Sequence, residues 1–366
     1  MATIFKSFLN NDVATTRTLL HEAIPLTGTI VSGTYTGDAN IKNYAHGMFQ
    51  SVYDYPYLSS SANHVLDLTV GFSSNSNLSA SSPNGESQQS KKINTYNQMA
   101  QMLVGYKEDG TIREFDKDGD LSGGTKLKEV VFVNFARLLN KDEIKKGSFS
   151  IEFLTGGTTT KRVPSVTLSV PIKINDSGSA TDYRVNSPAG EYGILYSETG
   201  SQVGLIYYQA GVVVLTGAVF GGDRKASGLG GAFGPPNSGA YSSYDSTTNS
   251  SSYDAYMTGT AGSISGACDG VRNCLTTLSF NNTTELNSTI YFCRANHNEF
   301  NYTSNPTYLD SSKIVVKNKS TDMPVSYITS VGLYSADNEL LAAAKISEPL
   351  KKTPTNELTL RVRLDY

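Results

Sequence analysis

Residues 326–366 read SYITSVGLYSADNELLAAAKISEPLKKTPTNELTLRVRLDY, and this stretch decides the fold class. Its first two segments, 326–334 and 340–346, are rich in β-branched, aromatic and apolar residues, with polar turn formers at 335–338 between them. This order predicts an antiparallel hairpin. In 357–366, leucine and valine alternate with threonine, arginine and aspartate. Such a period of two predicts a strand with one buried face and one solvent-facing side.

The residues before this stretch continue the same pattern. Residues 288–294 form a β-type run of threonine, isoleucine, tyrosine and phenylalanine, and 313–317 form another. Between them stands the turn dipeptide Asn305-Pro306, because proline biases the preceding residue away from helix. The chain from Asn287 onward therefore predicts a β unit in which the C-terminal strand is docked rather than loose.

Three phrases in this region carry a resemblance: EFNYTSNPTY at 299–308, YITSVGLYSADNELLAAAKISEPLKK at 327–352, and the closing LRVRLDY at 360–366. In this order they resemble virion structural proteins of contractile-tailed, T4-like phages, cyanophages among them. The hairpin phrase is also similar to hairpins in phage tail and baseplate appendages. The resemblance implies a protein that assembles in the tail or baseplate and carries out no chemistry.

Composition sets further bounds. A chain of 366 residues can hold one large or two medium domains with a substantial core. Charged residues are 17% of the chain and the net charge is −3, so no basic surface points to a nucleic acid as partner. No apolar run approaches the roughly 20 residues that a bilayer span needs. We therefore expect neither nucleic acid nor membrane as a partner.

Export is also not predicted. The first residues lack the apolar core of a signal peptide. The three cysteines, Cys268, Cys274 and Cys293, leave one unpaired, which argues against a secreted disulfide framework. We expect synthesis in the reducing cytoplasm of the host and a final location in the virion.

The N-terminal part predicts helices mixed with strands. Asn11 or Asp12 can cap a helix that runs to about Ile24, where Pro25 stops it. Residues 41–53 and 93–104 predict two more helices, the latter with an aligned apolar face and closed by Gly105. Residues 26–36 are strand-like, 64–72 pass into a strand, and the polar run 73–90 predicts an exposed loop.

From residue 128 the chain predicts β structure. Strands are expected at 130–134, 149–153 and 163–174, followed by a meander of 193–196, 203–208 and 212–220. Residues 221–266 are a long Gly-, Ser- and Tyr-rich segment, which predicts a loop insertion because strands resume at Leu275. We therefore predict a mainly β (α+β overall) protein, with a mixed helical and β region at 1–127 and a β-sandwich-like domain at 128–366.

Two groups of residues could in principle bind a metal. Asp116-Lys-Asp-Gly-Asp120 imitates the start of an EF-hand loop, but Leu121 and Leu127 stand where the loop needs glycine and a bidentate glutamate. An ordinary acidic turn is the expectation. Cys268, Cys274, Cys293 and His297 offer four zinc ligands, but the spacing is not that of a zinc knuckle, so buried free thiols are expected. The sequence therefore predicts no metal.

Neither a cofactor nor catalysis is predicted. The glycine-rich run 228–234 leads into Pro235-Pro236, whereas a phosphate site needs a helix N-terminus there. His21-Glu22 lacks the second histidine of a metalloprotease motif, and His46 and His64 stand far apart. A triad assembled only by folding stays open at this stage.

The predicted function is that of a structural subunit of a phage tail or baseplate. Its partners would be other virion structural proteins, and the chain would form a homo-oligomer or occur in many copies of a symmetric assembly. The alternative is a receptor- or carbohydrate-binding appendage, because tyrosine offers a large amphipathic contact area at a low entropic cost. The candidate contact residues are Tyr208, Tyr241, Tyr244, Tyr253 and Tyr256.

Overall fold

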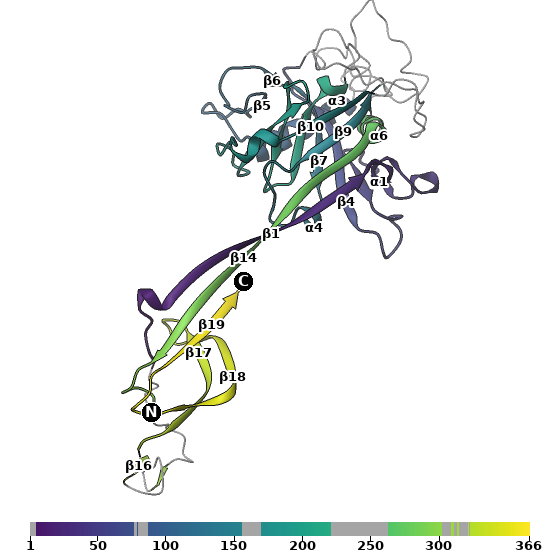
Figure 1. Cartoon of the computed structure of the whole chain (residues 1–366). Helices are drawn as coiled ribbons and strands as arrows, with labels where there is room; N and C mark the ends of the chain where they lie inside the picture. The colour runs from purple at the N-terminus through teal and green to yellow at the C-terminus, as the bar shows by residue number, and fades with distance from the viewer. Residues whose placement is uncertain are drawn as a thin grey trace, which may run out of the picture. The chain divides into compact units, whose positions relative to one another are not determined.

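The computed structural model describes residues 5–76, 79, 87–155, 170–220, 263–301, 309–310, 313–314, 321 and 323–366 (Figure 1). As predicted, the fold is mainly β, with 47% strand and 16% helix. The strands are β1 (Val13–Thr27), β2 (Ile41–Asn43), β3 (Gln50–Tyr53), β4 (His64–Phe72), β5 (Phe115–Asp116), β6 (Lys126–Leu127), β7 (Glu129–Phe135), β8 (Glu143–Ile144), β9 (Ser150–Thr155), β10 (Val170–Asn175), β11 (Tyr192–Ser197), β12 (Gln202–Tyr207), β13 (Val212–Thr216), β14 (Leu275–Ala295), β15 (Leu309–Asp310), β16 (Lys313–Ile314), β17 (Ser326–Tyr334), β18 (Leu340–Lys352) and β19 (Leu358–Asp365).

Helices are few and short. The α-helices are α1 (Gly28–Ser32), α3 (Ser87–Leu103), α4 (Arg137–Asn140) and α6 (Ile264–Cys274). Short 3-10 helices are η1 (Asn10–Asp12), η2 (Thr36–Asp38), η3 (Ser177–Ala180) and η4 (Gly217–Phe220). The predicted helix at 93–104 is confirmed as part of α3, and the Gly105 amide closes it by donating to the Ala100 carbonyl at 2.9 Å.

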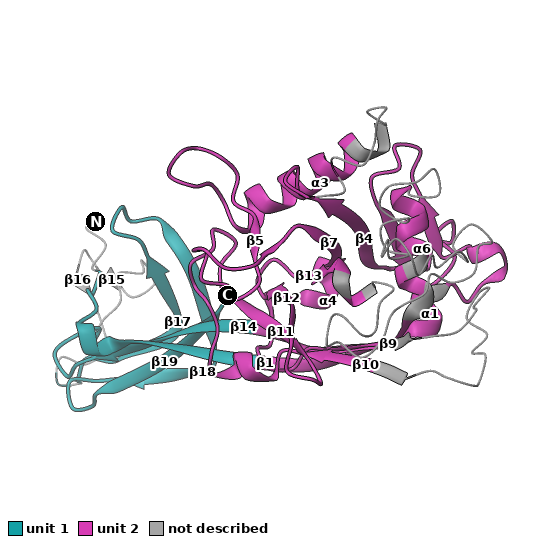
Figure 2. Cartoon of the chain, turned by 90° about the horizontal axis from the view of Figure 1, so that it is seen from above, with its two compact units in different colours: residues 1–19, 285–366 teal, residues 20–284 magenta. Residues whose placement is uncertain are grey.

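The chain forms two compact units, coloured separately in Figure 2. Unit 1 comprises residues 1–19 and 285–366, and unit 2 comprises residues 20–284. The division differs from the predicted boundary at 127/128, because β4 pairs with β7 along its length and joins both predicted regions in one sheet. Strands β1 and β14 are each divided between the two units, β1 after residue 19 and β14 after residue 284.

One large antiparallel sheet organises unit 2. Its order is β1-β14-β9-β10-β11-β12-β13-β7-β4-β3-β2, so the predicted meander of β11, β12 and β13 lies at its centre. Alternate residues of each central strand belong to two different cores, because successive side chains of a strand point to opposite faces. In β7, Val131 and Val133 pack in the larger core, whereas Val130 and Phe132 pack in the smaller one.

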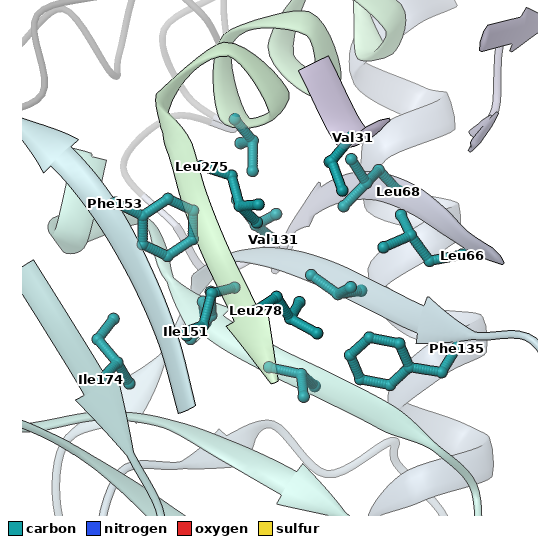
Figure 3. Close-up of a cluster of buried hydrophobic side chains, with 14 of the residues drawn as sticks. Val31, Leu66, Leu68, Val131, Phe135, Ile151, Phe153, Ile174, Leu275 and Leu278 are labelled. Carbon is teal, nitrogen blue, oxygen red and sulfur yellow. The ribbon is translucent and has the colours of Figure 1, made fainter. Parts of the chain in front are cut away.

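The larger core shows that the sheet folds back on itself. Phe135 of β7 and Phe280 of β14 lie far apart in the strand order, yet their ring centroids are 4.7 Å apart. Figure 3 shows the same core, where Val31 of α1 meets Leu68 of β4. One face of the sheet therefore closes around a common interior, a β-sandwich-like arrangement.

The smaller core lies under α3 and the β5–β6 hairpin. Gly71 of β4 permits the close approach of α3, since a Cβ at this position would lie 2.8 Å from the Lys92 carbonyl oxygen. The Tyr96 hydroxyl donates to the Leu127 carbonyl at 2.8 Å and accepts from the Phe115 amide at 3.2 Å. One buried tyrosine of α3 therefore holds both strands of the hairpin.

Three predictions for the N-terminal region were wrong. The predicted helix from Asn11 or Asp12 to Ile24 is strand β1, and the predicted helix at 41–53 is the β2–β3 pair. Residues 28–32, inside the predicted strand-like segment 26–36, form α1. In the two predicted helices, the apolar pattern also fits a strand, and pairing with a neighbouring strand outweighs the local preference.

The C-terminal predictions were more accurate. Strands β17 and β18 form the predicted hairpin, and its turn closes with the Ser335 amide donating to the Glu339 carbonyl at 2.9 Å. The predicted C-terminal strand is β19, which pairs with β14 from Ser288 to Ala295. The predicted insertion 221–266 lies outside the described residues up to 262, and residues 264–266 begin α6.

Candidate functional site

The described part of unit 1 is a regular β structure with hardly any buried apolar residues. Among its described residues, only Ala295, Val325 and Leu333 are both apolar and buried. Twelve of the twenty large apolar residues that the described chain exposes lie in unit 1, although it holds fewer than a third of the residues. Ordering a chain segment of this length costs on the order of 100 kcal/mol of conformational entropy, which burial of apolar surface normally offsets.

The β14–β19 pair carries the most regular apolar face of unit 1. Opposite residues of an antiparallel pair share a face, so Tyr291 and Cys293 stand beside Val362 and Leu360. The apolar residues of β19 are Leu358, Leu360, Val362 and Leu364. They alternate with exposed polar residues as predicted, but they are half-buried and not buried. The prediction of a buried face is therefore wrong for the single chain.

The β17–β18 hairpin adds exposed apolar side chains at its tip. Tyr334, Leu340 and Leu341 are 45%, 56% and 68% exposed. The ring of Phe5 packs edge-on against Tyr334 with centroids 4.9 Å apart, so the N-terminal segment covers part of this surface. We use the name unit 1 apolar surface for two sets of residues, the half-buried apolar residues of β19 and the exposed Tyr334, Leu340 and Leu341 of the hairpin.

Polar contacts, rather than an apolar core, connect the segments of unit 1. Lys352 is fully buried, and its ammonium donates to Asn301 Oδ1 at 2.8 Å and to the carbonyls of Thr353 at 2.9 Å and His297 at 3.2 Å. Asp12 is almost fully buried and pairs with Arg294 at 2.6 Å. Each buried charge is thus compensated, as its desolvation requires.

Of the predicted contact tyrosines, Tyr208 alone lies among the described residues. Tyr208 is fully buried, and its hydroxyl donates to Asp176 Oδ2 at 2.9 Å, so it cannot contact a partner. Burial raises the pKa of Tyr208 above its ordinary value. Tyr241, Tyr244, Tyr253 and Tyr256 lie outside the described residues, as does the glycine-rich run 228–234.

Among the described side chains, Cys268, Cys293 and His297 do not form a group that could hold a metal, and the side chain of Cys274 lies outside those described. Cys268 is buried in α6 of unit 2 and its thiol donates to the Leu68 carbonyl at 3.3 Å. Cys293 is half-buried in β14 of unit 1, and exposed His297 lies 3.3 Å from Glu357. Burial raises the pKa of both described thiols, which disfavours the thiolate that zinc needs.

The acidic turn does bring its carboxylates together. One carboxylate oxygen each of Asp116, Asp118 and Asp120 lies within 4.8 Å of the others. Burial raises the pKa of Asp116, and the neighbouring carboxylates add to this rise while Lys126 opposes it. Strands β5 and β6, and not helices, flank the loop. Leu121, at the position that a calcium loop reserves for glycine, nevertheless adopts φ 62°, the left-handed conformation that glycine favours.

Folding also assembles a histidine, an aspartate and a serine. His64 Nε2 lies 2.8 Å from Asp67 Oδ1, and the Ser51 hydroxyl donates to that same oxygen. The hydrogen bond to Asp67 raises the pKa of His64, and partial burial opposes this rise. A nucleophilic serine needs the histidine next to its hydroxyl. Here the aspartate stands between the two, so the group does not form a nucleophile–base relay.

An aromatic cluster surrounds the β2–β3 hairpin of unit 2. Tyr44 stacks on His46 with centroids 5.1 Å apart, and Tyr53 lies 6.2 Å from Tyr57. The ammonium of Lys42 lies 4.8 Å from the Tyr44 ring centroid. These five residues, which we call the β2–β3 aromatic cluster, are half-buried or exposed. Sequence reasoning missed this cluster because it predicted a helix here.

Comparisons with protein-family models, curated proteins and solved structures found no match for this chain. In the part of the chain that the structure describes, no helix is long and apolar enough to cross a membrane.

Proposed function

We propose that this protein is a structural subunit of a tailed-phage virion, in the tail or baseplate, and that it acts through protein–protein assembly contacts. The unit 1 apolar surface is the single observation that carries this proposal. A unit of regular strands with three buried apolar residues among those described needs a further surface to cover it. The resemblance of 299–308, 327–352 and 360–366 to virion structural proteins indicates which kind of assembly supplies that surface.

The occupant that we propose for this surface is another copy of the same chain. A specific interface buries about 800 Å² on each partner. Leu340, Leu341 and Tyr366 are all more than half exposed, and the half-buried side chains of β19 add to this area. Unpaired strand edges and apolar faces that recur on every copy favour closed, symmetric assembly. The chain would be made in the host cytoplasm and would occur in many copies in the virion.

Self-association of the purified chain tests the contact. Leu341→Asp places a charge on the unit 1 apolar surface, and Leu138→Asp is the matched control in unit 2, where Leu138 is 63% exposed. Both side chains are exposed, so neither change should disturb folding. We expect light scattering to show an oligomer that Leu341→Asp dissociates and Leu138→Asp leaves intact. A wild-type chain that stays monomeric at micromolar to millimolar concentration contradicts the proposed self-contact.

The virion role needs its own measurement. Quantitative mass spectrometry of purified particles that carry this gene should find the chain in a fixed multiple of copies per tail. Its absence from purified particles would reject the structural role, whatever the oligomeric state of the isolated chain.

The receptor-binding alternative has one observation in its favour, the β2–β3 aromatic cluster. Partly exposed aromatic rings beside a lysine are a surface on which sugar rings could stack. A glycan array compares the wild type with Tyr57→Ala and with Tyr183→Ala, an exposed tyrosine outside the cluster. Binding lost only in Tyr57→Ala would favour this alternative, whereas no binding by the wild type would reject it.

A further inference from the structure

The loop between β5 and β6 is held in place before any ligand arrives. The Tyr192 hydroxyl lies 2.7 Å from the Gly119 carbonyl oxygen, and the Asn186 amide donates to the same oxygen at 3.3 Å. Tyr192 is fully buried. The middle of the acidic loop is therefore fixed to the rigid sheet, while the side chains of Asp118 and Asp120 remain accessible.

Asp116 supplies an observation that is independent of the clustering of acidic residues. This aspartate is 0% exposed, and its Oδ2 accepts from the Lys126 ammonium at 2.8 Å. Its other oxygen, Oδ1, is buried and accepts no hydrogen bond from a described N–H or O–H donor, and the Asp120 carboxylate lies close enough to share a proton with Asp116. A buried acceptor without a partner costs about 1–3 kcal/mol, and more where it is charged. Such an oxygen points to a ligand that compensates it.

Space for that ligand lies beside Gly124. A Cβ on this glycine would lie 3.4 Å from Asp116 Oδ1 and 3.2 Å from Asp118 Oδ2. The two oxygens therefore border one common point that the glycine leaves free of side-chain atoms. Lys126 contacts Asp116 through the opposite oxygen and does not occupy this point.

We propose that Asp116, Asp118 and Asp120 bind one calcium ion, with Asp116 Oδ1 as the buried ligand. Calcium takes six to eight oxygen ligands in a flexible geometry, and an open loop with carboxylates, carbonyls and access for water can supply them. Magnesium demands a nearly ideal octahedron and gives up its water reluctantly. The site is not an EF-hand, because Leu127 at the twelfth position is buried in β6 and cannot serve as a ligand.

Binding to the full-length chain tests the proposal directly. After treatment with chelator, calorimetric titration with calcium chloride should show one saturable site, with magnesium bound at least about tenfold more weakly. Terbium, a hard cation that also prefers oxygen ligands, should bind at the same point. Its luminescence on tyrosine excitation should rise, because Tyr192 lies against Gly119 of the loop. Calcium should compete this luminescence away.

Variants assign the site. Asp118→Asn and Asp120→Asn should each weaken calcium binding at least about tenfold, since affinity follows the number of charged ligands. Asp109→Asn is the matched control, because Asp109 is an exposed loop aspartate that lies outside the cluster. Its carboxylate accepts a hydrogen bond from the Thr111 hydroxyl. Asp116→Asn is avoided because Asp116 is buried against Lys126. The proposal is overturned if no saturable binding occurs up to about 1 mM calcium, the weak end of protein calcium sites. It is equally overturned if both cluster variants bind as the wild type does.

Discussion

Asp176 and two neighbouring tyrosines allow a matched test of the core of unit 2. Asp176 is fully buried and accepts hydrogen bonds from the Gly147 amide at 2.8 Å, the Phe149 amide at 2.9 Å and the Tyr208 hydroxyl at 2.9 Å. Tyr207, the preceding residue, is equally buried, but its hydroxyl has no hydrogen-bond partner among the described groups. Tyr208→Phe and Tyr207→Phe therefore both delete a buried hydroxyl oxygen. The hydroxyl of Tyr208 is hydrogen-bonded, whereas that of Tyr207 is not hydrogen-bonded to any described group.

The expected magnitudes follow from that difference. Tyr208→Phe removes a hydrogen bond to a carboxylate, which is worth about 1.5–3 kcal/mol of unfolding free energy. In a domain of this size, about 2–4 °C of melting temperature corresponds to each kcal/mol, so the loss is roughly 3–12 °C. Tyr207→Phe removes a hydroxyl that was desolvated without compensation, so its stability should be unchanged or higher by about 1 kcal/mol.

The pH dependence gives a second, signed readout. Burial raises the pKa of Asp176, and the hydrogen bonds from Gly147, Tyr208 and Phe149 oppose that rise. Because the folded pKa is raised, stability from this group is present below the unfolded pKa of about 3.9 and is lost as the pH rises through the folded value. Tyr208→Phe removes one opposing donor and raises the pKa further. Its deficit in stability should thus grow between about pH 4 and pH 7.

Urea unfolding, followed by circular dichroism at both pH values, measures these differences. The reasoning is refuted if Tyr208→Phe costs less than about 0.5 kcal/mol, the range of ordinary surface substitutions. It is also refuted if Tyr207→Phe costs as much as Tyr208→Phe, since loss of general packing would then explain both.

Three further predictions concern other parts of the chain. Gly193→Ala should lower the free energy of unfolding in urea by about 1–3 kcal/mol, because its Cβ would lie 2.2 Å from the Tyr208 hydroxyl oxygen. Gly178→Ala is the control and should be tolerated, because its Cβ would lie 4.0 Å from the nearest atom, in the Tyr196 ring. Burial lowers the pKa of Lys92 to about 8. Its contribution to stability should therefore be present above about pH 10.4 and lost as the pH falls through about 8. Lys92→Met should remove this pH dependence from melting temperatures measured over a pH series. Deletion of 357–366 removes the partner of β14 and should yield protease-sensitive protein, and a truncated chain with an unchanged melting transition would contradict this.

The sequence predicted strands well where apolar and β-branched residues fill a run bounded by polar turns. Strand β7, the meander of β11, β12 and β13, the β17–β18 hairpin and β19 all overlap the predicted ranges, although residues 217–220 at the end of the predicted strand 212–220 form η4. In each of these strands, local preference and sheet pairing agree.

Helices were overpredicted where the apolar residues also fit a helical face. In β1, Leu19 and Leu20 are exposed, so these residues do not form the buried face of a packed helix. Its backbone is instead committed to β14, which lies about 260 residues away in the chain. A pairing over such a distance leaves no local sign, and this is why the strand could not be predicted.

The candidate calcium site was partly visible in the sequence. The spacing of Asp116, Asp118 and Asp120 was recognised, but Leu121 argued against a calcium loop because glycine normally takes the required conformation. The structure shows Leu121 in that conformation. The buried, unpartnered Asp116 Oδ1 could not be foreseen, since it depends on how α3 and the sheet cover the start of the loop.

Strands β7 and β19 show what the apolar pattern of a strand can and cannot specify. In β7, the apolar run 130–133 is continuous, the sheet is covered on both faces by other parts of unit 2, and these residues are buried. In β19, apolar and polar residues alternate with a period of two, and Leu360 and Val362 are half-buried. The apolar pattern of a strand indicates which face avoids water. It does not indicate whether the surface that covers this face belongs to the same chain. The difference between these strands therefore motivates the assembly proposal, because an apolar face that the described part of the chain leaves half uncovered calls for a second surface.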